Sequence, residues 1–282
     1  AWSAQKLPGR PACKYVRGWE GAPLSIEVHR TACIVSHPPG GEGANDALVN
    51  PANERLAGTR FTPDECWLEL YGDPTSGAAL SFDDRYLTYP FQTIDGLVTD
   101  FGGEALRCEL EELPADAQGV RCPAGGAVVG SSHGELREMY GTIVHAVVPF
   151  YRPGELEGDA WAEHATATYR SAFDAAQRHG LVSVAVPLLG AGARGAEMPD
   201  ASFALKAAAE AVVSWQGLAA GGCRLTARFG VQTSTLAHAL AEAIEEAMHR
   251  AERRSEMGHG FEAARRFKRE PSFVEEHRAA VG

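Results

Sequence analysis

One glycine-rich segment carries residues suited to binding a phosphate. Gly190-Ala191-Gly192-Ala193-Arg194-Gly195 follows an apolar run and matches the pattern GxGxxG. Glycines in such a turn let backbone amides approach a phosphate closely. The segment lies late in the chain, Pro199 delays the next helix, and no acid follows a later strand to hold a ribose. We therefore predict a phosphate-binding turn rather than a dinucleotide-binding fold; a plain strand-to-helix turn is the alternative.

A second segment, Gly130-Ser131-Ser132-His133-Gly134, matches the nucleophile-elbow pattern GxSxG. A catalytic triad with Ser132 would need an acid and a histidine later in the chain, and the candidates are Asp159, Asp174 and His238. However, only residues 135–140 separate the pattern from the next predicted strand. A parallel crossover needs about a dozen residues or more, so this short link predicts a hairpin, which cannot present an elbow serine. We therefore expect no serine hydrolase.

Composition excludes several other classes of function. The chain has 282 residues, with 26 Lys+Arg against 37 Asp+Glu and a formal charge of −11, which disfavours nucleic-acid binding. Its six cysteines form no CxxC or CxxH pair, so we expect no metal site and no cofactor. No stretch approaches the roughly 18 apolar residues of a transmembrane helix. His145 lies within an apolar strand and is predicted to be a satisfied core residue.

The elements that must position these residues alternate between strand and helix from residue 102 to residue 254. This alternation predicts an α/β sandwich with a mostly parallel sheet. Apolar patterning predicts strands at residues 24–30, 47–49, 127–129, 142–148, 181–189 and 225–231, with residues 33–35 extending the first or forming a neighbour. It predicts helices from Gly103, at 161–176, at 199–215 and at 236–248, the last capped by Thr233 or Ser234.

The remaining segments define the domain organisation. Residues 1–23 are rich in proline and glycine and predict an irregular N-terminal arm. Residues 24–254 form the α/β domain, which an aperiodic segment at about residues 59–92 interrupts. Residues 255–282 predict a charged C-terminal extension.

Four segments, taken in order, resemble the macro domain family. Residues 46–53 (Asp-Ala-Leu-Val-Asn-Pro-Ala-Asn) resemble the strand and turn that open its ribose site. Residues 94–98, with the Gly102-Gly103 pair and Leu106, resemble the helix after its first loop. Residues 122–129 and 143–149 resemble its next hairpin, and residues 183–195 resemble its second phosphate loop.

The resemblance implies a three-layer α/β/α sandwich with a mixed, mostly parallel sheet, in a domain that binds ADP-ribose, free or attached to protein. It implies that Asn53 hydrogen-bonds the distal ribose, that the amides of residues 190–195 hold the diphosphate, and that Phe229, or Phe150 and Tyr151, stacks on adenine. Asp95 matches the acid that helps activate water or the ribose in hydrolases of the family. The implied ligand-binding residues are Asn50, Asn53, Gly190, Ala191, Gly192, Ala193, Arg194, Gly195 and Phe229, and the implied catalytic residue is Asp95.

The chain departs from the family pattern in ways that leave hydrolysis open. Gly58-Thr59-Arg60-Phe61 and the insertion replace the usual run of glycines, and Arg60 is a candidate to replace the lost amides with a charge-assisted phosphate contact. Arg30-Thr31-Ala32-Cys33 stands where the family has an adenine-reading acid, and Thr99 stands where many hydrolases have a histidine.

Two functions remain as hypotheses. The first is binding of ADP-ribose or a related nucleotide, with ADP-ribosyl hydrolysis as the activity if the protein is an enzyme. The alternative is a non-catalytic accessory subunit of a larger complex, with protein partners held by the arm, the insertion and the tail. The sequence starts at Ala1 rather than at a methionine, which is compatible with removal of a targeting peptide. This second hypothesis therefore includes a location in a chloroplast or mitochondrion.

Overall fold

The computed structural model describes residues 24–58, 93–218 and 225–257, together with the backbone of five short strands outside these ranges. Three of those strands lie in the insertion and form a small antiparallel sheet: β4 (Arg60–Phe61), β6 (Tyr86–Thr88) and β5 (Ser81–Asp83). The side chain of Arg60 lies outside the described residues.

The main sheet has eight strands, and its centre is parallel. From edge to edge the order is β11 (Phe267–Glu270), β1 (Cys13–Arg17), β2 (Ser25–Arg30), β10 (Thr226–Val231), β9 (Ser183–Val186), β3 (Ala47–Pro51), β8 (Thr142–Ala146) and β7 (Ala127–Ser131). The strands from β2 to β8 run parallel, whereas β1, β11 and β7 pair antiparallel at the two edges. The predicted mixed, mostly parallel sheet is therefore confirmed.

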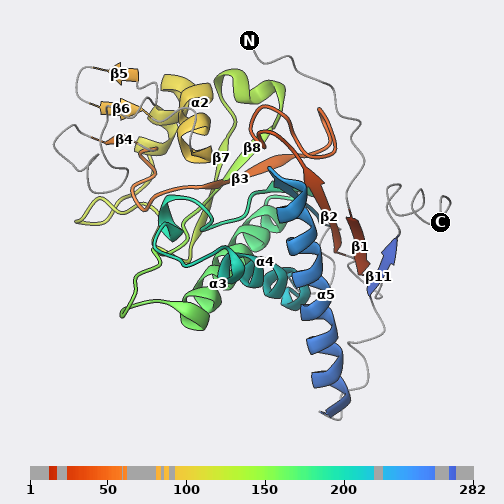
Figure 1. The fold of residues 1–282 in the computed structure, drawn as a ribbon. Helices are drawn as coiled ribbons and strands as arrows, with labels where there is room; N and C mark the ends of the chain where they lie inside the picture. The colour runs from red at the N-terminus through yellow and green to blue at the C-terminus, as the bar shows by residue number, and fades with distance from the viewer. Residues whose placement is uncertain are drawn as a thin grey trace.

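Helices cover both faces of this sheet (Figure 1). Three of them, α3 (Gly158–Arg178), α4 (Ser202–Ser214) and α5 (Ser234–Met257), pack on one face over the larger apolar core. The helix α2 (Ile94–Glu111) packs on the other face over a smaller core. This arrangement confirms the predicted α/β/α sandwich.

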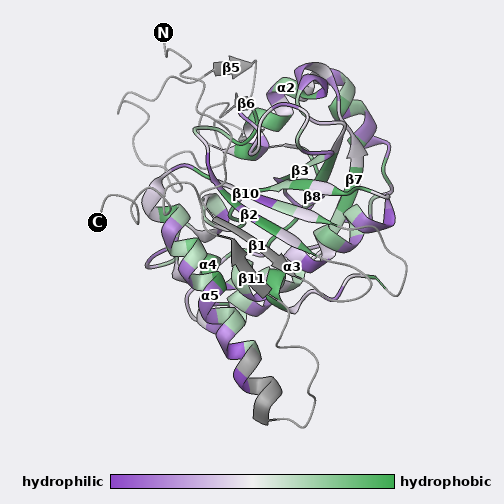
Figure 2. Ribbon diagram, turned by 90° about the vertical axis from the view of Figure 1, so that its right-hand side faces the viewer, coloured by the Kyte–Doolittle hydropathy of each residue, from purple (hydrophilic) through white to green (hydrophobic). Residues whose placement is uncertain are grey.

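Amphipathic patterning accounts for the longest helix. Hydrophilic and hydrophobic residues alternate along α5 (Figure 2), and its buried positions Leu240 and Ile244 are one helical turn apart. The hydroxyl of Thr233 accepts a hydrogen bond from the amide of Leu236 at 3.1 Å, so the predicted N-cap is confirmed at Thr233.

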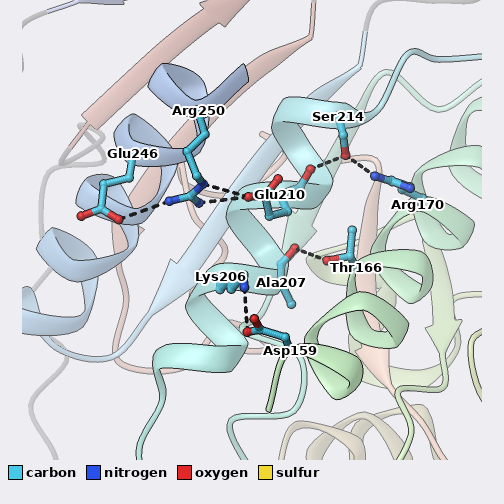
Figure 3. Close-up of polar contacts among 9 residues, drawn as sticks. All are labelled: Asp159, Thr166, Arg170, Lys206, Ala207, Glu210, Ser214, Glu246 and Arg250. Carbon is cyan, nitrogen blue, oxygen red and sulfur yellow. Dashed lines mark hydrogen bonds and ion pairs between the residues drawn. The ribbon is translucent and has the colours of Figure 1, made fainter. Parts of the chain in front are cut away.

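Polar contacts at the edges of the apolar core join the three helices of the larger layer (Figure 3). Lys206 on α4 lies 2.7 Å from the carboxylate of Asp159 on α3. Arg250 on α5 contacts Glu210 on α4 at 3.0 Å and Glu246 on its own helix at 3.5 Å. These ion pairs surround the apolar contacts rather than replace them.

Three local predictions were wrong or incomplete. Residues 33–35 form turns instead of a strand, and the amide of His37 donates to the carbonyl of Cys33 at 2.8 Å. The helix expected from Gly103 begins at Ile94 and is kinked at Gly103, whose φ of 61° is outside the helical range. The N-terminal arm is not wholly irregular, because β1 within it pairs with β2.

Candidate functional site

Asn50, at the carboxyl end of β3, lies at the centre of a buried polar cluster beneath α2. Its side chain is 1% exposed. Its Nδ2 donates to Oδ1 of Asp95 at 2.8 Å and lies 3.2 Å from Nδ1 of His145. The parallel register of β3 and β8 places Asn50 opposite His145. One amide group therefore links an acid on a helix to a histidine on the neighbouring strand.

Asp95 reaches this cluster from the first turn of α2. Thr93 caps the helix, because its hydroxyl accepts a hydrogen bond from the amide of Gly96 at 3.0 Å. A carboxylate in the first turn is stabilised by the helix dipole. The hydroxyl of Thr99 donates to the backbone carbonyl of Asp95 at 2.8 Å. The position of the Asp95 side chain is therefore fixed by the helix start as well as by Asn50.

His145 is neutral at physiological pH. Burial lowers its pKa to about 4, and the charge of Glu109 opposes this shift. Because Nδ2 of Asn50 is a donor, Nδ1 of His145 must accept, and the ring proton is assigned to Nε2. Within the described part of the chain, Nε2 of His145 and Oδ1 of Asn50 have no hydrogen-bond partner.

The Asn50 amide is oriented with its NH2 group toward both neighbours, Oδ1 of Asp95 and Nδ1 of His145. In this orientation Asn50 donates to Asp95, and its contact with Nδ1 selects the tautomer of His145 that carries the ring proton on Nε2. The three side chains act as one unit that holds Asp95 in place.

Asn53, predicted to bind a ribose, organises the turn that follows β3. Its Nδ2 donates to the carbonyl of Gly58 at 2.7 Å, and its Oδ1 accepts from the amides of Arg55 and Ala57 at 3.1 and 3.3 Å. Gly58 has a φ of 73°, and a Cβ there would lie 2.2 Å from the hydroxyl of Thr99. The turn therefore packs directly on α2, and the Asn53 amide is engaged within it.

The glycine-rich loop follows β9, next to β3 in the sheet. A Cβ at Gly190 would lie 2.4 Å from the ring of Trp161, and one at Gly195 would lie 1.9 Å from the carbonyl oxygen of Gly190. Both glycines are thus required by the path of the chain. Ala191 and Gly192 are exposed, and Ala193, Arg194 and Gly195 form a short 3₁₀ turn. The predicted phosphate-binding segment is therefore accessible to solvent at Ala191 and Gly192.

Arg194 ties this loop to the other two loops at the same end of the sheet. Its guanidinium pairs with both carboxylate oxygens of Glu54, at 2.8 and 2.6 Å. It also donates to the carbonyl of Val148 at 2.7 Å and lies 4.5 Å from the centroid of the Phe150 ring. The backbone carbonyl of Arg194 accepts from the amide of Tyr151. Three loops are therefore joined at one side chain.

Phe229 does not lie on this surface. Its ring is fully buried in the larger core, 6.1 Å from the ring of Tyr169, so no base can stack on it without opening the core. Tyr151 is also buried, between Trp161 and Phe203. Phe150 is 41% exposed and is the accessible aromatic side chain among the three that were considered. Alternation along β10 directs Phe229 inward, which the aromatic residue type alone does not reveal.

The segment 130–134 does not have the geometry of a nucleophile elbow. The strands β7 and β8 form the predicted antiparallel hairpin, and Ser132 is buried at 2% exposure. The triad candidates are engaged elsewhere: Asp159 pairs with Lys206, Asp174 accepts from the indole of Trp215, and His238 contacts the carbonyl of Ser234.

The described residues hold neither a candidate metal centre nor a membrane-spanning helix. In that part of the chain, no group of three or more histidine, cysteine, aspartate or glutamate side chains is placed to hold a metal ion. None of the helices described there is long and apolar enough to span a bilayer.

Sequence reasoning missed two members of this region. His145 was predicted to be a satisfied core residue, yet it contacts the Asn50 amide and keeps an unpartnered Nε2. The signal that could have found it is the parallel register, which places a polar residue of β8 beside one of β3. Glu54 directly follows Asn53 in the sequence, but its pairing with Arg194 depends on how two distant loops meet.

Comparison with known proteins identifies the class to which this fold belongs. Residues 84–205 match the family model of the Macro domain. This range contains Asp95, His145 and the glycine-rich loop, whereas Asn50 and Asn53 precede it. The resemblance of the chain to the macro domain family is therefore confirmed. No curated protein matches the sequence.

Solved macrodomain structures share the fold over most of this chain. A macrodomain from Oceanobacillus iheyensis with ADP has a TM-score of 0.54 and 16% identity, covering 84% of this chain and 98% of its own. A mutant of that macrodomain with ADPR has a TM-score of 0.53 and 15% identity, covering 83% and 98% respectively. The protein described here thus has a macrodomain fold.

Proposed function

We propose that this protein binds ADP-ribose, or an ADP-ribosyl group on a protein, at the carboxyl ends of β3 and β9. The observation that carries the proposal is the exposed glycine-rich loop after β9, because β9 pairs with β3, whose carboxyl end carries Asn50 and the turn of Asn53. Ligands of α/β folds bind outside the carboxyl ends of parallel strands. The similar Oceanobacillus iheyensis structures contain ADP and ADPR, which supports the same ligand class.

A charge placed in the loop tests this proposal without disturbing the fold. A Cβ at Gly192 would meet no described atom within 4 Å, so a Gly192→Glu variant should remain folded. Its carboxylate would lie where we expect the diphosphate, and binding should be lost. Calorimetric titration with ADP-ribose, with ADP and NAD as comparators, measures this effect.

The matched control adds the same charge at the other end of the same strand. Val182 is 48% exposed and directly precedes β9. The Val182→Glu variant should bind ADP-ribose as the wild type does. Equal affinity in the Gly192→Glu variant and the wild type would contradict the proposed site.

ADP-ribosyl hydrolysis is the second candidate activity, and Asp95 is the residue proposed to carry it. Support comes from its position in the first turn of α2, held by Asn50. An Asp95→Ala variant should lose release of ADP-ribose from a modified protein while still binding the free nucleotide. Unchanged release by this variant would remove Asp95 from the reaction. If the wild type releases nothing, binding alone remains.

The alternative of an accessory subunit gains no support from the strand pairing. Part of the arm and part of the tail are joined to the sheet of this chain, because β1 pairs with both β2 and β11. Protein partners and an organellar location therefore stay predictions of the sequence alone.

A further inference from the structure

The ion pair between Glu54 and Arg194 spans the two loops that the proposed ligand would contact. Glu54 follows Asn53 in the turn after β3, and Arg194 lies in the glycine-rich loop after β9. Both guanidinium-to-carboxylate contacts are short, at 2.8 and 2.6 Å, so the pairing is bidentate. This geometry is the one by which arginine recognises either a carboxylate or a phosphate.

Glu54 resembles an anionic ligand in its chemistry as well as in its position. The hydrogen bonds from Arg194 hold the pKa of the Glu54 carboxyl below its usual range, so the group stays ionised near neutral pH. The Glu54 side chain is 33% exposed, whereas that of Arg194 is 11% exposed. The carboxylate is therefore the solvent-facing member of the pair.

The Glu54 side chain, which is hydrogen-bonded to Arg194 and to its own backbone amide, can leave Arg194 without moving the main chain. Its backbone carbonyl accepts from the amides of Arg121 and Cys122, at 2.8 and 3.0 Å, which fixes the main chain. The guanidinium of Arg194 has other contacts, because it donates to the carbonyl of Val148 and lies against the ring of Phe150. Arg194 therefore keeps its place if the carboxylate leaves.

We propose that Glu54 is an internal competitor for Arg194, and that a diphosphate ligand displaces this carboxylate when it binds. The proposal rests on the proposed function and deepens it, since it names a side chain that recognises the ligand and a contact that opposes binding. The guanidinium exchanges one anion for another, and the displaced carboxylate turns toward solvent. The affinity for the diphosphate therefore depends on the difference in free energy between the Arg194–diphosphate pair and the Arg194–Glu54 pair.

A Glu54→Gln variant tests the competition because it removes the charge and keeps the size and one acceptor. Titration with inorganic pyrophosphate and with ADP-ribose should show tighter binding than in the wild type, by up to about fivefold, the range of a partly exposed ion pair. A Glu197→Gln variant is the matched control, since Glu197 is exposed and follows the same loop. It removes the same charge and should change the affinity little.

A Glu54→Gln, Arg194→Gln double variant shows whether the gain passes through Arg194. It should lose the tighter binding, and equal thermal midpoints would show that all variants are folded. Unchanged or weaker binding of both anions by Glu54→Gln, or an equal gain in Glu197→Gln, overturns the competition.

These outcomes separate the competition from the proposed function. If Glu54→Gln binds pyrophosphate more tightly but does not bind ADP-ribose, the displacement of Glu54 from Arg194 is supported and ADP-ribose is excluded as the ligand. If the wild type and Glu54→Gln bind ADP-ribose with equal affinity, ADP-ribose is supported as the ligand and the competition by Glu54 is contradicted.

Discussion

The two faces of the sheet differ in what they bury. The face under α3, α4 and α5 is lined by apolar side chains, with alanines on α4 that let the helices approach closely. The face under α2 buries Asn50, Asp95 and His145 among a smaller apolar set. Polar groups in a core cost stability unless they are hydrogen-bonded, so this second face gives up apolar contacts to hold an acid in place. One face stabilises the fold and the other positions the candidate site.

The largest effect is expected at Trp161, which connects the stable face to the glycine-rich loop. Its ring is fully buried, its indole donates to the carbonyl of Pro149 at 2.9 Å, and it packs against Gly190. A Trp161→Ala variant should lose about 3–5 kcal/mol of unfolding free energy. Urea denaturation measures the loss, and Trp161→Phe should lose less. A loss below about 1 kcal/mol would show that this face does not carry the stability.

The next effect is a pH dependence that belongs to the α2 face. The pKa of His145 is lowered from 6.5 to about 4 in the folded protein. Between these values the unfolded chain binds the proton and the native chain does not, so stability falls as the pH drops from 6.5 to about 4. The loss is on the order of 3 kcal/mol.

A His145→Gln variant should flatten this part of the stability curve, since glutamine does not titrate. Denaturation at a series of pH values measures both proteins. The Glu27 carboxyl titrates at lower pH, with a pKa of about 2, because of its contacts with His29 and Arg228, and should be unaffected. Parallel curves for the variant and the wild type would contradict the buried, neutral state of His145.

A smaller effect is expected from removing the amide that joins the cluster. An Asn50→Ala variant leaves Asp95 and His145 without their shared donor and should lose about 1–3 kcal/mol. It should also weaken any activity that depends on Asp95. Asn45→Ala is the matched control, because Asn45 is buried but hydrogen-bonds the carbonyl of Pro39 instead. Loss of activity in both variants would show that stability, not position, is responsible.

The smallest effect is expected at the outer edge of the stable face. Arg250 pairs with Glu210 and Glu246 on the helix surfaces (Figure 3). An Arg250→Ala variant should lose at most about 1 kcal/mol, because partly exposed ion pairs are screened by water and salt. Thermal unfolding at low and high salt measures it. A loss comparable to that of Trp161→Ala would mean that charges, rather than apolar packing, hold these helices together.

Apolar periodicity was sufficient to predict most of the elements on the stable face. The helices α3 and α5 and the strand β10 follow repeats of helical or strand spacing, which a single segment displays by itself. Apolar periodicity missed the start of α2, because the apolar pattern becomes clear only after Gly103, whereas the family resemblance had placed a helix at residues 94–98. Residues 33–35 were mispredicted because a short apolar run is equally compatible with a buried turn.

The sequence by itself determined the layered fold, the family resemblance and the position of the glycine-rich loop, since each depends on residues that are close together in the chain. Only the tertiary structure decided the partners of the site residues. It brought Asn50 to Asp95 and His145, it placed Phe229 in the core, and it paired Arg194 with Glu54. The physical reason is that hydrogen bonds and ion pairs are short-ranged, so they depend on strand register and on loops that meet only after folding.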